Sequence, residues 1–152
     1  MDPIEERLRT SQPIENQQER ALLNILHTSN ALRNHFAEYF KQHGLTEPQF
    51  NVLRILRGQH GKPMNLFEIG DRMVHRESNV SRIVDKLEAK GLVVRKEDET
   101  NRRRVDISIK PEGVAILESM RPKLYAELDA CFERLSSEEL RTLNTLLDKI
   151  QA

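Results

Sequence analysis

Amide, hydroxyl and guanidinium side chains gather on one side of residues 77–90, a segment whose apolar residues recur with a helical period. At about 100° per residue, the apolar residues share a stripe about 100° wide. They are Val80, Ile83, Val84 and Leu87. The other side carries Ser78, Asn79, Ser81, Arg82, Asp85 and Lys86. Asn, Ser, Arg and Lys can hydrogen-bond the base edges and phosphates of a DNA major groove. The pattern predicts an amphipathic helix over residues 77–90 with a polar side suited to nucleic acid.

A run of three arginines follows, between two β-prone segments. Residues 92–95 are rich in valine, and apolar residues alternate with polar ones over residues 105–110, the period of a half-buried strand. The arginines at the expected hairpin tip, Arg102, Arg103 and Arg104, cannot bury their charge without an anionic partner. The tip is either a solvated turn or a wing along the phosphate backbone, and the preceding helix favours the wing.

Different roles are expected for these polar residues. Base-edge or adjacent phosphate contacts are expected from Ser78, Asn79, Ser81 and Arg82, although each serine could instead cap the helix end. We expect Lys86 to contact phosphate or water, and Asp85 to orient a neighbouring arginine. The arginine triplet would grip the backbone or enter the minor groove. Arg76, just before the helix, is assigned to the same surface.

The elements that must position this surface are predicted to be helices. Residues 15–43 have apolar residues at three- and four-residue steps, and Gly44 ends that helix. A second helix precedes a loop over residues 58–63. Asn65 and Glu68 have the spacing of a capping box and open the next helix. Gly91 is placed to end the central helix in a left-handed conformation.

The two ends of the chain differ in pattern. Residues 1–14 carry two prolines and no sustained periodicity, so we expect an arm that is ordered only where a partner holds it. Pro111 favours the start of a helix that runs to about residue 135. Ser136 and Glu139 form another capping box, which opens the last helix.

Residues 66–113 resemble the winged helix-turn-helix of the MarR family of transcription regulators. Residues 66–73 resemble its first helix, residues 79–93 its recognition helix, and residues 98–113 its wing. The resemblance implies a mainly α-helical fold with a small β-hairpin. The winged helix-turn-helix would cover residues 46–110, with dimerisation helices in residues 15–45 and 111–152.

Three positions depart from the usual family pattern. Asn101 stands where the family often has aspartate before the paired arginines. Gly70 stands where alanine is common, costing about 1 kcal/mol of helix propensity unless close packing requires it. Lys110 stands where a capping threonine is usual. The family also implies a small-molecule pocket between the dimerisation region and the DNA-reading lobe. Candidate lining residues are His35, Phe36 and Tyr39, which could equally be ordinary core or interface.

The apolar stripes of the outer helices exceed what a reading unit of about 45 residues can cover. A two-fold homodimer would bury them and would set two recognition helices about one helical turn of DNA apart. We therefore expect a homodimer on a pseudo-palindromic site. The alternative is an unusually helical monomer.

Composition limits the other classes of function. The 152 residues suit one domain, and the net charge is zero, but residues 62–110 hold twelve basic against nine acidic residues. The single cysteine, Cys131, excludes an intrachain disulfide, fits a reducing cytosol, and is expected to be buried as a small apolar residue. No apolar run reaches the ~18 residues of a membrane span, and the acidic start lacks signal-peptide features. We expect a cytoplasmic location without a membrane partner.

Catalytic and metal-binding signals are not evident. The sequence has no Gly-rich phosphate loop, zinc-ligand spacing or nucleophile motif, and all five histidines precede the central helix. We expect neither an enzyme nor a cofactor. The sequence instead predicts a sequence-specific double-stranded DNA-binding transcriptional regulator, a repressor relieved by a small-molecule effector in families of this kind. The alternative is a winged-helix protein-interaction module, whose arginine tip would meet an acidic protein.

Overall fold

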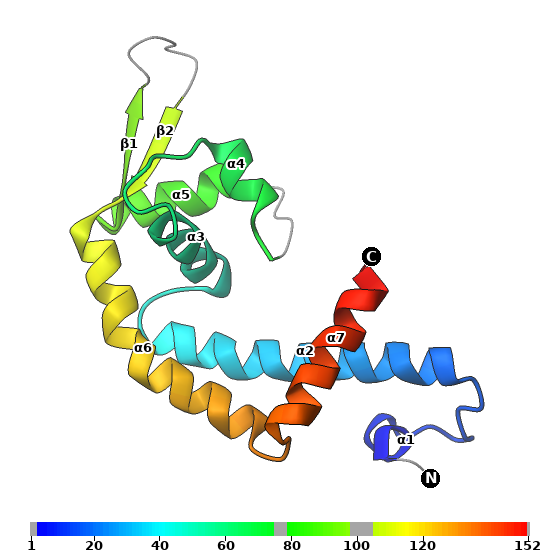
Figure 1. Cartoon of the computed structure of the whole chain (residues 1–152). Helices are drawn as coiled ribbons and strands as arrows, with labels where there is room; N and C mark the ends of the chain where they lie inside the picture. The colour runs from blue at the N-terminus through cyan, green and yellow to red at the C-terminus, as the bar shows by residue number, and fades with distance from the viewer. Residues whose placement is uncertain (1–2, 75–78, 98–104, 152) are drawn as a thin grey trace. The chain divides into compact units, whose positions relative to one another are not determined.

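The computed structural model describes residues 3–74, 79–97 and 105–151 (Figure 1). It divides into two compact units, Met1–Glu47 and Pro48–Ala152. In chain order, the described elements are α1 (Pro3–Leu8), α2 (Gln17–Gln42), α3 (Glu47–Arg57), α4 (Leu66–Asp71), α5 (Val80–Ala89), β1 (Val93–Glu97), β2 (Val105–Ile109), α6 (Pro111–Phe132) and α7 (Ser137–Gln151). A mainly helical chain with one small hairpin is therefore confirmed.

The long helix α2 dominates the first unit. Its N-cap is Asn16, whose side chain accepts a hydrogen bond from the Glu19 N–H at 2.8 Å. Its end is a Schellman motif: the N–H of Leu45 donates to the Phe40 carbonyl, and Gly44 has a φ of 68°. The predicted helix and its glycine stop are confirmed to within two residues.

The N-terminal arm differs from the expectation, because α1 folds against α2 through contacts within the chain. Ile4 and Glu5 of α1 are buried, Glu5 being only 1% exposed. The Glu5 carboxylate accepts a hydrogen bond from the Ile14 N–H at 2.7 Å and pairs with the Arg20 guanidinium at 3.2 Å. These partners compensate the cost of burying a carboxylate.

The core of the second unit lies where α3, α4, α5 and the hairpin meet. Residues of all these elements are almost fully buried there: Val52, Leu53, Leu56, Ile69, Val84, Leu87, Val93 and Ile107. Val84 and Leu87 belong to the apolar stripe predicted for the central helix. Their burial confirms which side of α5 faces the protein.

Strands β1 and β2 pair antiparallel, with Val93 opposite Ile109 and Glu97 opposite Val105. Both strands were predicted. An additional contact was not: Ile107 exchanges two backbone hydrogen bonds with Met64, at 3.0 and 2.8 Å. This isolated β-bridge ties the hairpin to Met64, in the segment just before α4.

The connections after α5 follow the expected glycine and proline positions. Gly91 has a φ of 70°, and the N–H of Leu92 donates to the Leu87 carbonyl, which completes a Schellman motif. Pro111 occupies the first turn of α6, while its N-cap residue, Lys110, makes no side-chain capping bond. A lysine ammonium has no acceptor for a backbone N–H, which explains the missing cap.

Helix α7 begins as predicted at the Ser136–Glu139 capping box, in which the Ser136 N–H donates to the Glu139 carboxylate at 2.8 Å. The described part of α7 contains no buried residue. Cys131, near the end of α6, is exposed, so its expected burial is wrong. The last buried residue of α6 is Met120. No helix among the described residues is long and apolar enough to cross a membrane.

Candidate nucleic-acid interface

Helix α4 and the turn after it hold the start of α5. The predicted capping box is confirmed: Asn65 Oδ1 accepts from the Glu68 N–H at 2.9 Å, and the Glu68 carboxylate accepts from the Asn65 N–H at 2.8 Å. A Cβ added at Gly70 would lie 3.2 Å from Val80 Cγ2, so the glycine does permit close packing of α4 on α5. The capping box stabilises the start of α4, and Gly70 lets α4 approach α5 closely.

A buried side chain supports the turn between these helices. Asn51 on α3 is buried, and its Oδ1 atom accepts a hydrogen bond from the Val74 N–H at 3.1 Å. Sequence inspection did not identify Asn51 as part of the interface. The only hint is an amide in the middle of an otherwise apolar stretch of α3, where a buried polar group requires a partner.

Helix α5 begins later than predicted, at Val80 rather than at residue 77. Asn79 has non-helical backbone angles and acts as the N-cap, its Oδ1 atom accepting from the Arg82 N–H at 3.2 Å. Asparagine is among the preferred N-cap residues because its short side chain reaches the first free N–H groups. The Asn79 side chain therefore keeps its amide N–H donors, rather than the capping oxygen, for any DNA contact.

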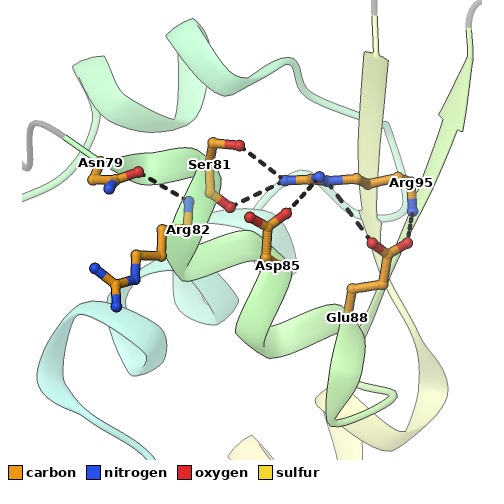
Figure 2. Close-up of polar contacts among 6 residues, drawn as sticks. All are labelled: Asn79, Ser81, Arg82, Asp85, Glu88 and Arg95. Atoms are coloured by element: carbon orange, nitrogen blue, oxygen red, sulfur yellow. Dashed lines mark hydrogen bonds and ion pairs between the residues drawn. The ribbon is translucent and has the colours of Figure 1, made fainter.

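Arg95 on β1 makes the principal polar contacts with α5 (Figure 2). Its Nη1 atom lies 2.6 Å from Asp85 Oδ1. Its Nη2 atom donates to the Ser81 carbonyl at 3.0 Å and to Ser81 Oγ at 3.3 Å. Glu88 completes the set by accepting the Arg95 backbone N–H at 3.2 Å. The arginine expected to pair with Asp85 is thus a strand residue that the sequence did not single out.

These contacts divide the polar side of α5 into two stripes. Ser81, Asp85 and Glu88 are spaced by four and three residues, so they share one side of the helix, which Arg95 engages. Arg82 and Lys86 form the neighbouring stripe and are exposed. Neither cationic side chain has a hydrogen-bond or ion-pair partner among the described residues, and the Arg82 guanidinium extends away from the Arg95 cluster (Figure 2).

Five of the predicted DNA-binding residues lie outside the described residues, and their roles remain predictions. They are Arg76, Ser78, Arg102, Arg103 and Arg104. The structure brings together Asn79, Ser81, Arg82 and Lys86 in the first turns of α5. The resulting surface offers amide, hydroxyl, guanidinium and ammonium donors, which suit acceptor-rich base edges and phosphates.

The predicted pocket residues lie on α2. His35 is exposed, Phe36 is half-buried and Tyr39 is buried. The rings of His35 and Phe36 meet edge to face with centroids 5.2 Å apart, and those of Tyr39 and His43 lie 4.8 Å apart. The three residues thus belong to an aromatic series along one helix, and their role in ligand binding remains a prediction. Among the described residues, no cluster of three or more His, Cys, Asp or Glu side chains could hold a metal ion.

A helix-turn-helix packed beside a β-hairpin defines a winged helix, the architecture of many DNA-binding proteins. The family model described as MarR family matches residues 43–104. The HTH-type transcriptional regulator MhqR of Bacillus subtilis is 30% identical over 120 residues, which cover 79% of this chain and 81% of that protein. The chain belongs to the MarR family and is therefore a DNA-binding transcription regulator rather than an enzyme.

Solved structures share the fold over nearly the whole chain. A MarR cysteine-to-serine mutant from E. coli in complex with operator DNA matches with a TM-score of 0.80 and 22% identity, over 93% of this chain and 100% of that one. The organohalide-sensing RdhR regulator in its 2,4-dichlorophenol-bound form matches with a TM-score of 0.82 and 19% identity, over 93% of this chain and 85% of that one.

Proposed function

We propose that this chain represses transcription by binding a pseudo-palindromic operator as a homodimer, in the cytoplasm, and that a small-molecule effector releases it. The observation that carries the DNA-binding part is the exposed Arg82 and Lys86 stripe of α5, whose cationic groups have no partner among the described residues. Arginine can grip a guanine with two hydrogen bonds, while lysine suits a phosphate. Sequence preference would therefore come mainly from Arg82.

The wing is proposed to add affinity that does not depend on sequence. Arg102, Arg103 and Arg104 would contact the phosphate backbone or a narrow minor groove. Replacing Arg103 by alanine should weaken binding to all sequences similarly and should reduce the slope of log affinity against log salt by about one unit. An unchanged slope would show that Arg103 does not contact a phosphate.

Exposed apolar side chains on the outer helices support the homodimer. Leu22 and Leu26 on α2 are 55% and 56% exposed. On α7, Leu146 and Ile150 are 52% and 66% exposed. Apolar rows of this kind occur where another protein surface covers them. Sedimentation equilibrium should give a dimer at micromolar concentration, and a monomer with undiminished sequence-specific binding would contradict the proposal.

Effector control is supported by the aromatic series of α2. We place the ligand against His35, Phe36 and Tyr39, whose rings suit an aromatic compound. The RdhR regulator, which shares the fold, has been solved with a chlorinated phenol bound. Chlorinated and unsubstituted phenols are therefore the first compounds to test for release of bound DNA. Phe36→Ala should abolish the response while leaving effector-free DNA binding in place.

Selection from a random double-stranded DNA pool tests the central proposal. Wild-type protein should enrich two inverted half-sites separated by about one helical turn. A variant with both Arg82 and Lys86 replaced by alanine should not enrich them. Ser119→Ala on α6 is the matched control, because Ser119 is exposed and bonds only within its own helix, to the Ile116 carbonyl. Failure of the wild type to enrich any sequence would favour a protein-binding winged helix instead.

A further inference from the structure

Arg95 and Ser81 form a contact whose chemistry goes beyond holding β1 against α5. We infer that Arg95 fixes the Ser81 hydroxyl as a hydrogen-bond donor toward DNA, so that Ser81 selects an acceptor atom. This inference rests on the proposed DNA-binding function and specifies how one residue of that surface discriminates among bases.

The guanidinium of Arg95 is held at several points (Figure 2). Nη1 pairs with Asp85 Oδ1 at 2.6 Å, and Nη2 donates to the Ser81 carbonyl at 3.0 Å. With its plane anchored in this way, the second Nη2 hydrogen is available to Ser81 Oγ at 3.3 Å. The Arg95 side chain is 25% exposed, so this arrangement is partly shielded from water.

An arginine side chain carries only donors and does not lose its proton in proteins. Ser81 Oγ must therefore accept from Arg95, and the positive charge turns the hydroxyl hydrogen away from the guanidinium. No described residue accepts that hydrogen in a hydrogen bond. Ser81 is exposed in the first turn of α5, two residues after the Asn79 cap, so its hydroxyl group is accessible to an acceptor on DNA.

A serine without such a neighbour can donate or accept, and so tolerates either kind of partner. Arg95 occupies one of the two Ser81 Oγ lone pairs and places a positive charge beside the other, which favours donation by Ser81 over a second acceptance. Ser81 would then bond purine N7, guanine O6, thymine O4 or a phosphate oxygen in preference to the amino groups of adenine N6 and cytosine N4. If Ser81 contacts a base, it would create a preference at one base pair of each half-site. If it contacts a phosphate, it would fix the position of α5 along the DNA backbone. Arg95 acts in this scheme as a positioning residue.

Base and phosphate analogues separate these acceptors. The site enriched by the wild type would be scanned with 7-deazapurines, 2-aminopurine in place of guanine, a pyrimidinone lacking the thymine O4, and methylphosphonates. The analogue that removes the acceptor used by Ser81, placed once in each half-site, should weaken wild-type binding about three- to tenfold. This is the effect of one hydrogen bond. Ser81→Ala should bind the intact site more weakly by the same factor and should not respond to that substitution. Ser81→Thr, which keeps the hydroxyl, should respond as the wild type does.

The role of Arg95 has its own readout. Arg95→Met should broaden the base preference at the Ser81 position to include amino-bearing groups, which a loss of affinity alone would not do. Ser119→Ala should match the wild type throughout. If Ser81→Ala keeps the analogue sensitivity of the wild type, or if Arg95→Met keeps its base preference, the inference is overturned although DNA binding stands. A wild type that enriches no sequence overturns the proposed function itself.

Discussion

Arg95 Nη1 lies 2.6 Å from Asp85 Oδ1, and this ion pair joins the first strand of the hairpin to the recognition helix. It has two effects. It links the orientation of the hairpin to that of α5, and it neutralises a carboxylate on the helix proposed to approach DNA phosphates. The ion pair should contribute little to the free energy of unfolding, because Asp85 is 54% exposed and solvent weakens its attraction to Arg95.

Arg95→Ala should therefore weaken DNA binding more than it destabilises the fold. Loss of the partly exposed pair should cost about 1 kcal/mol of unfolding free energy or less. Asp85 and Glu88 would be left as unneutralised charges on α5. Urea unfolding and fluorescence anisotropy with labelled operator measure the two quantities. The double variant Arg95→Ala/Asp85→Ala should recover part of the lost affinity, and strictly additive losses would show that the pair does not act as a unit.

Arg82 and Lys86 should differ in how their loss affects specificity. Arg82→Ala should cost on the order of 1–3 kcal/mol of binding free energy and relax preference at one base pair. Lys86→Ala should weaken binding to all sequences and lower the salt slope by about one unit. Both side chains are exposed, so neither change should alter the unfolding free energy by more than about 0.5 kcal/mol. Equal losses on every sequence for Arg82→Ala would assign it to phosphate instead.

Gly113→Ala should destabilise the second unit. A Cβ at this position, near the start of α6, would overlap the Leu92 carbonyl oxygen and would lie 2.8 Å from Ile109 Cγ1. Because the nearer atom belongs to the backbone, relief requires α6 to shift, at a cost of about 1–3 kcal/mol. Thermal unfolding measures the loss. Gly58→Ala is the matched control, since its nearest neighbour would be 3.4 Å away.

The start of α7 should be sensitive to acid. The Ser136 backbone N–H, and secondarily its hydroxyl, donate to the Glu139 carboxylate and lower the pKa of that carboxyl. A lowered folded-state pKa means that the stabilisation is complete above the ordinary glutamate pKa of about 4.3 and is lost as the pH falls through the lowered value. Carboxyl chemical shifts and circular dichroism should follow this transition.

Glu139→Gln provides the control for the acid transition. Glutamine can still complete a capping box but does not titrate, so the variant should keep α7 and lose this component of the pH dependence. A Ser136→Ala variant keeps the backbone N–H and loses only the hydroxyl, so it should move the Glu139 pKa part of the way back toward its ordinary value. A Glu139 pKa that is the same in the wild type and in Ser136→Ala would show that the hydroxyl does not contribute to the shift.

Features set by neighbouring residues were predictable from the sequence. The apolar stripe of α5, the capping boxes at Asn65 and Ser136, and the glycine stops of α2 and α5 each depend on side chains within one or two helical turns. These contacts form in the folded protein because the local backbone conformation by itself brings the paired residues together. The sequence patterns sufficed to locate the helix-turn-helix and the hairpin, and to assign polar residues to the exposed side of α5.

Only the tertiary structure shows that the polar side of α5 consists of two stripes. A helical period gives the angular position of Ser81, Asp85 and Arg82, but it cannot show that Arg95, on a separate strand, reaches the first two and leaves the third without a partner among the described residues. The Met64 bridge, the Asn51 support and the Glu5–Arg20 pair arise in the same way. Each joins residues that become neighbours only after the chain has packed, so their pairing depends on three-dimensional distance rather than on spacing along the sequence.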